Sequence, residues 1–329
     1  MSSLFDPYTL KGVTLRNRIA VPPMCQYSAI DGLANDWHHV HVASMARGGA
    51  GLVVMEATAV SPEGRITPAC LGLWNDAQRD ALKPMVAAIK AGGAVPGIQI
   101  AHAGRKASAN VPWEGDDHIA EGDPRGWQTL APSAIAYGDG LPKVPREMTI
   151  AEIHRVRDDF VSAAQRALDA GFEWLELHFA HGYLAQSFFS KHSNQRTDEY
   201  GGSLENRSRF LVETLRAVRA VWPAHLPLTA RFGVLEFDGH DEETLAESIE
   251  LAKVFKAEGL DMLSVSIGFT IKETDIPWGV GFLSPITKRV RDETGLATTS
   301  AWGFGTPEVA QAAVQDEHLD IVMVGRSHL

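Results

Sequence analysis

Two histidines and a tyrosine lie within the nine-residue segment Leu175–Tyr183, which reads LELHFAHGY. His178 and His181 are three residues apart, and one glycine separates His181 from Tyr183. Two neutral imidazoles can donate hydrogen bonds to a carbonyl oxygen that gains negative charge, and a phenol can protonate a carbon nearby. The three side chains therefore suit a reaction in which charge develops on a carbonyl oxygen.

Two other interpretations of these histidines stay open. Together with His102 they could bind a metal ion, although no carboxylate or third imidazole follows them at a fixed short spacing. They could also be core histidines without a chemical role. We favour the chemical role because both follow a predicted strand, at a position where side chains face the mouth of a barrel.

Glycines and an arginine near the C-terminus form a second group. The segment 300–305 reads SAWGFG and precedes a helix that begins at Thr306-Pro307, and Gly325-Arg326 follows the last predicted strand. Such turns expose backbone N–H groups, and the loops after strands seven and eight are the usual phosphate site of a β/α barrel. We expect a bound phosphate here, with Arg326 as its charged partner. The alternative is that the glycines only end helices and that Arg326 is a surface residue.

Predicted strands alternate with predicted helices along the chain, and these elements position the groups described above. Short β-branched runs predict eight strands, at 19–21, 52–58, 95–101, 174–178, 228–232, 262–267, 298–302 and 321–325. Apolar residues spaced by three and four predict seven helices, at 37–47, 76–91, 150–170, 204–222, 242–258, 285–293 and 307–315. This count favours an α/β fold of the (β/α)8 TIM-barrel class over a doubly wound sheet, as a single domain over 1–329. The eighth helix is missing, so we expect the chain to be truncated at its C-terminus.

Two segments fall outside the alternation. Residues 4–18 predict an N-terminal hairpin with its turn at Lys11-Gly12, placed against the N-terminal end of the barrel. Residues 104–147, rich in glycine, proline and tryptophan, are too long for an ordinary loop after the third strand. We expect this long excursion to cross the C-terminal face, where barrel enzymes carry their chemistry.

Composition narrows the classes of partner. Among 329 residues, 30 are basic and 41 acidic, and the net charge of −11 disfavours nucleic acid and anionic membranes as partners. Cys25 and Cys70 are the only cysteines, too few for an iron–sulfur cluster, and they favour a reducing, cytoplasmic setting. No run of 18 apolar residues predicts a membrane-spanning helix.

The segment Leu175–Tyr183 and the run 194–207, NQRTDEYGGSLENR, resemble the old yellow enzyme family of FMN-dependent ene-reductases. The resemblance extends from the hairpin to Arg326. It implies a ping-pong NAD(P)H:enone oxidoreductase that reduces activated C=C bonds of small α,β-unsaturated carbonyl and xenobiotic compounds. It makes His178 and His181 the oxyanion donors and Tyr183 the proton donor. FMN is then the cofactor, NADPH or NADH the hydride donor, and a homodimer or higher homo-oligomer the assembly.

The resemblance also assigns the binding residues. Pro23, Met24, Cys25 and Ala57 line the flavin ring, and Gln99 and Arg231 hold its pyrimidine edge. The FMN phosphate lies against Ala301, Trp302, Gly303, Gly325 and Arg326. Tyr27 and Trp302 form walls of the substrate pocket beside His178, His181 and Tyr183. Cys25 is typical of one branch of the family, in which the thiol tunes the flavin's reduction potential.

Three rival functions remain at this point. The first is a metal-dependent TIM-barrel hydrolase built on His178, His181 and His102, although the expected site holds no metal. The second is a flavin-binding protein without turnover. The third, a 2-hydroxy-acid oxidase or dihydroorotate-type flavoenzyme, fits less well because such sites need a base that faces the substrate carbon.

Overall fold

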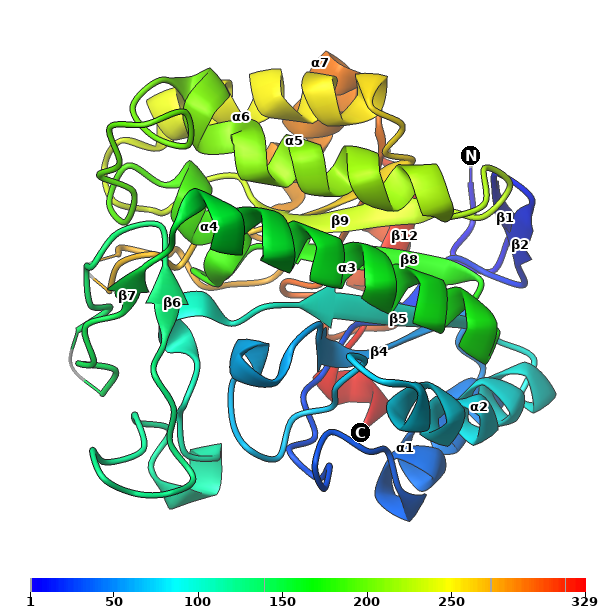
Figure 1. Ribbon diagram of the computed structural model, residues 1–329. Coiled ribbons are helices and arrows are strands. Elements are labelled where there is room, and N and C mark those ends of the chain that lie inside the picture. Colours follow the sequence, from blue (N-terminus) through cyan, green and yellow to red (C-terminus); the bar gives the residue numbers. More distant parts are fainter. Residues whose placement is uncertain (1, 139, 273, 317) are drawn as a thin grey trace.

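Eight parallel strands close into a barrel in the computed structural model, which describes residues 2–138, 140–272, 274–316 and 318–329 (Figure 1). Around the barrel the strands are β3 (Ile19–Val21), β4 (Leu52–Ala59), β5 (Val95–Ala101), β8 (Trp174–Phe179), β9 (Leu228–Gly233), β10 (Met262–Ser266), β11 (Ala297–Ser300) and β12 (Ile321–Met323). The last strand pairs with the first, Val322 opposite Ile19, which closes the sheet. The predicted TIM barrel is confirmed.

Helices cover the outside of the barrel. They are α1 (Asp36–Arg47), α2 (Asp76–Ala91), α3 (Ile150–Ala170), α5 (Leu204–Val221), α6 (Asp241–Ala257), α7 (Ser284–Thr294) and α8 (Pro307–Gln315). Each matches a predicted helix to within one residue at either end. The short α4 (Leu184–Phe189) was not predicted, and a 3-10 turn, η4 (Arg326–His328), follows β12.

Two predicted strands are too long. The segments 298–302 and 321–325 were expected to stay in the sheet, but β11 ends at Ser300 and β12 at Met323. The reason is glycine: Gly303 has φ 82, a left-handed conformation that turns the chain away from the barrel, and Gly325 adopts φ −97 and ψ −95, outside the strand region. Both segments therefore leave the sheet early.

Capping fixes where the helices begin. At α3 the Thr149 side chain accepts a hydrogen bond from the Glu152 N–H, and the Glu152 carboxylate accepts one from the Thr149 N–H. This reciprocal capping box pairs two backbone donors that the helix itself leaves free. One face of α3, which includes Val156 and Phe160, is buried against the barrel.

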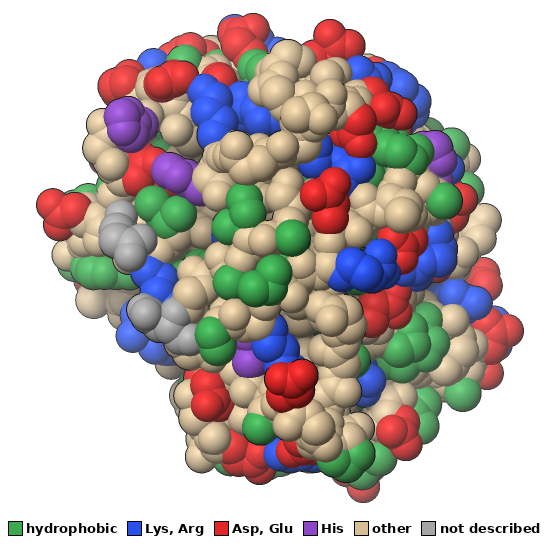
Figure 2. Space-filling model, turned by 60° about the vertical axis from the view of Figure 1, so that its left-hand side comes forward, with side chains coloured by type: hydrophobic (Ala, Val, Ile, Leu, Met, Phe, Trp, Pro, Cys, Tyr) green, Lys and Arg blue, Asp and Glu red, His purple; other side chains and the backbone are tan. Residues whose placement is uncertain are grey.

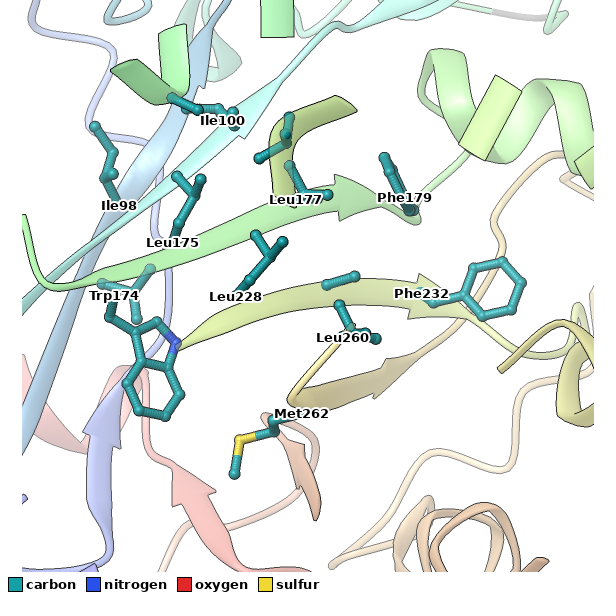
Figure 3. Close-up of a cluster of buried hydrophobic side chains, with 14 of the residues drawn as sticks. Ile98, Ile100, Trp174, Leu175, Leu177, Phe179, Leu228, Phe232, Leu260 and Met262 are labelled. Atoms are coloured by element: carbon teal, nitrogen blue, oxygen red, sulfur yellow. The ribbon is translucent and has the colours of Figure 1, made fainter. Parts of the chain in front are cut away.

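Alternation along the strands separates the core from the barrel interior. On β8, Leu175, Leu177 and Phe179 point outward into the apolar layer beneath the helices, as Figure 3 shows together with β5 and β9 side chains. Since successive side chains of a strand face opposite sides, Glu176 and His178 point into the barrel. Packing of the outer apolar layer thus fixes the strands, and with them the positions of the polar side chains inside the barrel.

The two extra segments lie at opposite ends of the barrel (Figure 1). The hairpin of β1 (Tyr8–Leu10) and β2 (Val13–Leu15) turns at Lys11-Gly12, as predicted, and the Gly12 N–H donates to the His225 carbonyl beside the start of β9. The excursion 104–147 contains η2 (Gly104–Lys106), η3 (Pro112–Glu114), β6 (Leu130–Ala131) and β7 (Arg146–Glu147). A further 3-10 turn, η1 (Pro62–Gly64), follows β4.

No helix in the described part of the chain has the length and apolar character needed to cross a lipid bilayer.

Candidate active site

The two histidines and the tyrosine meet at the C-terminal end of β8. Beyond the strand, His181 and Gly182 adopt left-handed backbone conformations, with φ 62 and 68, and Tyr183 occupies the N-cap position of α4. The ring centroids of His178 and His181 lie 5.0 Å apart, and those of His178 and Tyr183 also lie 5.0 Å apart. A sharp turn between a strand and a helix thus gathers three side chains that are adjacent in sequence.

All three side chains are held in their neutral forms. Burial lowers the pKa of His178 and His181 well below the usual value of an imidazole, and the positive charge of Arg231 adds to this effect in both. Burial also raises the pKa of the Tyr183 phenol well above its usual value. The site therefore offers two uncharged imidazoles and a phenol that keeps its proton.

Ser266, at the end of β10, completes the histidine pair, and sequence reasoning missed it. Its Oγ lies 2.7 Å from His181 Nε2 and accepts a hydrogen bond from the Trp302 indole N–H at 3.1 Å. Because an indole N–H only donates, Ser266 can give its own hydrogen to His181 Nε2, which would keep the His181 proton on Nδ1. Strand alternation, which turns Ser264 and Ser266 inward, was the available signal.

Lys106 of η2 is a second residue that was missed. Its ammonium donates to the carbonyls of His181 and Phe269, both at 2.8 Å, and these two residues have positive φ angles of 62 and 50. Lys106 thus ties together the turns after β8 and β10. Burial, with a smaller effect of neighbouring Arg105, lowers its pKa to about 7.

A buried polar cluster lies inside the barrel below the histidines. The Gln99 amide donates to Glu176 Oε1 at 2.7 Å, and Arg231 Nε donates to Ser264 Oγ at 3.2 Å and lies 3.7 Å from Glu176. Gln99 and Arg231 were predicted binding residues, whereas Glu176 was not. Burial raises the pKa of Glu176, although Arg231 and Gln99 act in the opposite direction.

The loop after β3 carries Cys25 and Tyr27. Burial raises the pKa of the Cys25 thiol well above the usual range, although the Ala57 backbone and the Tyr27 side chain act in the opposite direction. Such a thiol is a poor nucleophile. The Tyr27 ring packs edge-on against Trp113, with 6.2 Å between centroids.

A cavity of about 960 Å³ opens beside these groups. Of the predicted cofactor contacts, those that line it are Met24, Ala301, Trp302, Gly303, Gly325 and Arg326. Pro23, Cys25 and Ala57 lie outside its lining, as do Gln99 and Arg231 in the barrel interior. Figure 2 turns the left-hand side of Figure 1 forward and shows hydrophobic side chains exposed near the middle of that face.

The donor set of this cavity fits the phosphate end of FMN. Thr306 lines the cavity and caps α8, so that the N–H groups at the start of this nine-residue helix face the same region. A Cβ at Gly305 would meet no atom within 4 Å, so the backbone there is open to a ligand. Arg326 adds a positive charge.

The metal interpretation finds no support in the geometry. The His102 Nδ1 accepts a hydrogen bond from the Gly104 N–H at 3.0 Å. Among the residues that the structure describes, no three His, Cys, Asp or Glu side chains are grouped as metal ligands. His102 therefore does not complete a site with His178 and His181.

Neutral donors at the barrel mouth, beside a cavity with phosphate-binding features, define a TIM-barrel flavin oxidoreductase. The chain belongs to the NADH:flavin oxidoreductase / NADH oxidase family, the old yellow enzyme family, whose family model matches residues 3–329. The predicted class of enzyme, its FMN cofactor and its nicotinamide hydride donor are thereby confirmed.

Relatives and solved structures agree with this assignment. The chain is 40% identical over 331 residues to an NADPH dehydrogenase of Listeria monocytogenes, which covers 100% of this chain and 92% of that protein. It is 37% identical over 340 residues to an NADH:flavin oxidoreductase of Gibberella zeae, with 99% and 82% covered. An old yellow enzyme homologue from Zymomonas mobilis matches with a TM-score of 0.82, 30% identity and 99% and 89% coverage. Morphinone reductase in complex with tetrahydroNAD matches with a TM-score of 0.81, 30% identity and 99% and 87% coverage.

Proposed function

We propose that this enzyme is an NAD(P)H:enone oxidoreductase that reduces the activated C=C bond of small α,β-unsaturated carbonyl and xenobiotic compounds. Bound FMN supplies the hydride chemistry, between the reduced nicotinamide nucleotide and the alkene. The observation that carries the proposal is the placement of two neutral imidazoles and a protonated phenol together: the rings of His181 and Tyr183 each lie 5.0 Å from that of His178 and 6.4 Å from one another.

Each side chain has a distinct task. His178 and His181 donate hydrogen bonds to the substrate carbonyl oxygen, which stabilises negative charge there without themselves changing charge. Tyr183 delivers its phenol proton to the carbon next to the carbonyl. Tyr27 and Trp302 form the walls that restrict the pocket to small, flat compounds.

The cofactor contacts that the family resemblance assigns belong to the same proposal. Gln99 and Arg231 would hold the pyrimidine edge of the flavin, and Pro23, Met24, Cys25 and Ala57 would line the ring. Arg326, with the backbone of Ala301, Trp302, Gly303 and Gly325, would hold the phosphate. A positive Arg231 would also favour the negative charge of the reduced flavin.

Steady-state kinetics test the proposal. If NADPH and enone use one pocket in turn, double-reciprocal plots at several fixed concentrations of 2-cyclohexenone should be parallel. Intersecting lines would contradict the ping-pong scheme, and the absence of enone turnover would favour a flavin-binding protein without this activity. We also infer a cytoplasmic location, supported by the two free cysteines. The homodimer or higher homo-oligomer that the family resemblance implies belongs to the same proposal.

Replacement of Lys106 is expected to remove a pH dependence near neutrality. Since the pKa of Lys106 is about 7, its positive charge is present below that pH and lost above it. That charge favours negative charge on the substrate oxygen, so enone reduction should slow as pH rises, by up to about tenfold. Lys106→Met should give an enone-reduction rate that does not change between pH 6 and 8.5. This rate should equal the slow rate that the wild type shows at high pH.

Lys106→Arg provides the matched control, because a guanidinium stays charged throughout this range. It should keep the fast rate up to pH 8.5. A wild-type inflection that persists in Lys106→Met would assign the pH dependence to another group.

A further inference from the structure

A bulge in β4 releases from strand pairing one residue that neither the proposed chemistry nor the flavin contacts use. Met55 pairs with Ile98 and Ala57 with Gln99, so Glu56 has no partner on β5. A bulge redirects the side chain of its extra residue. Glu56 is only 4% exposed. Its carboxyl group reaches the loop after β3 on one side and α1 on the other.

Glu56 holds the backbone that carries Cys25 and Tyr27. Its Oε2 accepts a hydrogen bond from the N–H of Gln26, the residue between Cys25 and Tyr27, at 3.0 Å. Tyr27 has φ 49, a conformation that residues other than glycine keep only where their surroundings fix it. The carboxyl group therefore stabilises a strained turn directly after the flavin-side cysteine.

The second oxygen of Glu56 faces a buried imidazole. Its Oε1 lies 3.5 Å from His38 Nε2, and His38 is 1% exposed. Within the described chain this nitrogen has no hydrogen-bond partner, so Glu56 Oε1 is the acceptor that it faces. On its other side, His38 Nδ1 contacts both the N–H and the Oδ1 of Asn35, at 3.2 and 3.1 Å. His38 can therefore carry its proton on either nitrogen while the geometry stays the same.

Among the residues that the structure describes, no lysine or arginine forms an ion pair with Glu56. The titratable groups that face it are His38 and His41 from α1, Cys25 from the loop, and Cys70 from the segment after β4. Burial lowers the pKa of both imidazoles and raises that of both thiols, so all four are uncharged near neutral pH. Burial accordingly raises the pKa of Glu56 to about 8.

We propose that Glu56 is a positioning residue for the Cys25–Tyr27 loop, and that the charge state of the Glu56–His38 pair acts on the neighbouring Cys25. The proton state of a group outside the substrate pocket thereby sets the electrostatic environment of the flavin-side thiol. The proposal concerns the loop itself and holds whether or not enones are the substrates.

Alkylation of Cys25 in the FMN-loaded enzyme tests this proposal without any turnover. Iodoacetamide modification of Cys25 and of Cys70 is followed separately by peptide mass spectrometry. Glu56→Leu removes the acceptor, so Cys25 should react about tenfold faster at pH 7, as expected from loss of one hydrogen bond to a buried acid. Glu56→Gln keeps an amide oxygen for the Gln26 N–H and should retain the slow rate.

The pH dependence separates the charge from the positioning. Ionised Glu56 opposes formation of the Cys25 thiolate, so at pH 9 Glu56→Gln should react about tenfold faster than the wild type, and at pH 6 equally fast. If Glu56→Leu does not fold, the comparison of Glu56→Gln with the wild type at pH 6 and pH 9 decides whether Glu56 acts on Cys25. A Cys25 rate in folded Glu56→Leu within twofold of the wild type would overturn the positioning role. Identical pH profiles of the wild type and Glu56→Gln would overturn the role of the charge.

Discussion

Tyr183→Phe is expected to slow reoxidation of the reduced enzyme by 2-cyclohexenone by about 10²- to 10⁴-fold, the contribution of a positioned general acid. Reduction by NADPH should change by less than about threefold, since hydride donation needs no proton from the phenol. Rapid-mixing absorbance measurements under anaerobic conditions record the two half-reactions separately.

The structure explains why this substitution should affect one step only. The Tyr183 ring packs against His178 at 5.0 Å, and phenylalanine retains that packing. Burial first, and then the charge of Cys25 when ionised, raise the pKa of the phenol, so the proton stays in place until a substrate carbon takes it. Tyr200→Phe is the matched control. The Tyr200 hydroxyl donates to the Glu213 carboxylate at 2.8 Å, and this pair lies away from the site. Equal losses in both half-reactions for Tyr183→Phe would exclude the proton-donor role.

His178→Ala and His181→Ala should each lower the rate of enone reduction by about 10²- to 10³-fold, as removal of one oxyanion donor does. Both should also weaken the binding of a phenol such as 4-hydroxybenzaldehyde, because a phenolate oxygen mimics the developing oxyanion. The binding is measured by titration of the oxidised flavin spectrum.

The effects of the two histidine variants should not add, because the rings lie 5.0 Å apart and are expected to share one ligand oxygen. His154→Ala offers a control, since His154 lies on α3 and contacts Tyr200 rather than the barrel mouth. Unchanged phenol affinity in both variants would remove the histidines from the binding site.

Much of the fold is predictable because it depends on local patterns. The apolar period and the Thr149–Glu152 capping box define α3 to the residue. In contrast, α4 has six residues, all buried, and follows Tyr183 without a side-chain cap. It has no exposed face to produce an amphipathic period, and its helical form depends on the surrounding packing.

In the candidate site too, local residues were predictable from the sequence and distant contacts were not. His178, His181 and Tyr183 were predictable because they lie within one short segment with distinctive chemistry. Ser266 and Lys106 were not, because they act on His181 from 85 and 75 residues away in sequence. Glu176 and Glu56 were missed because a carboxyl group inside a strand has no sequence signal for its distant partners. Contacts of this kind are set by strand register rather than by sequence spacing.

The central claim is that one barrel mouth first takes up hydride from a nicotinamide nucleotide and then delivers it, with the Tyr183 proton, to an enone. The most direct test is an anaerobic absorbance titration of the purified enzyme. One equivalent of NADPH should bleach the flavin band, and one equivalent of 2-cyclohexenone should then restore it with formation of cyclohexanone. A band that stays bleached after the enone is added would contradict the account.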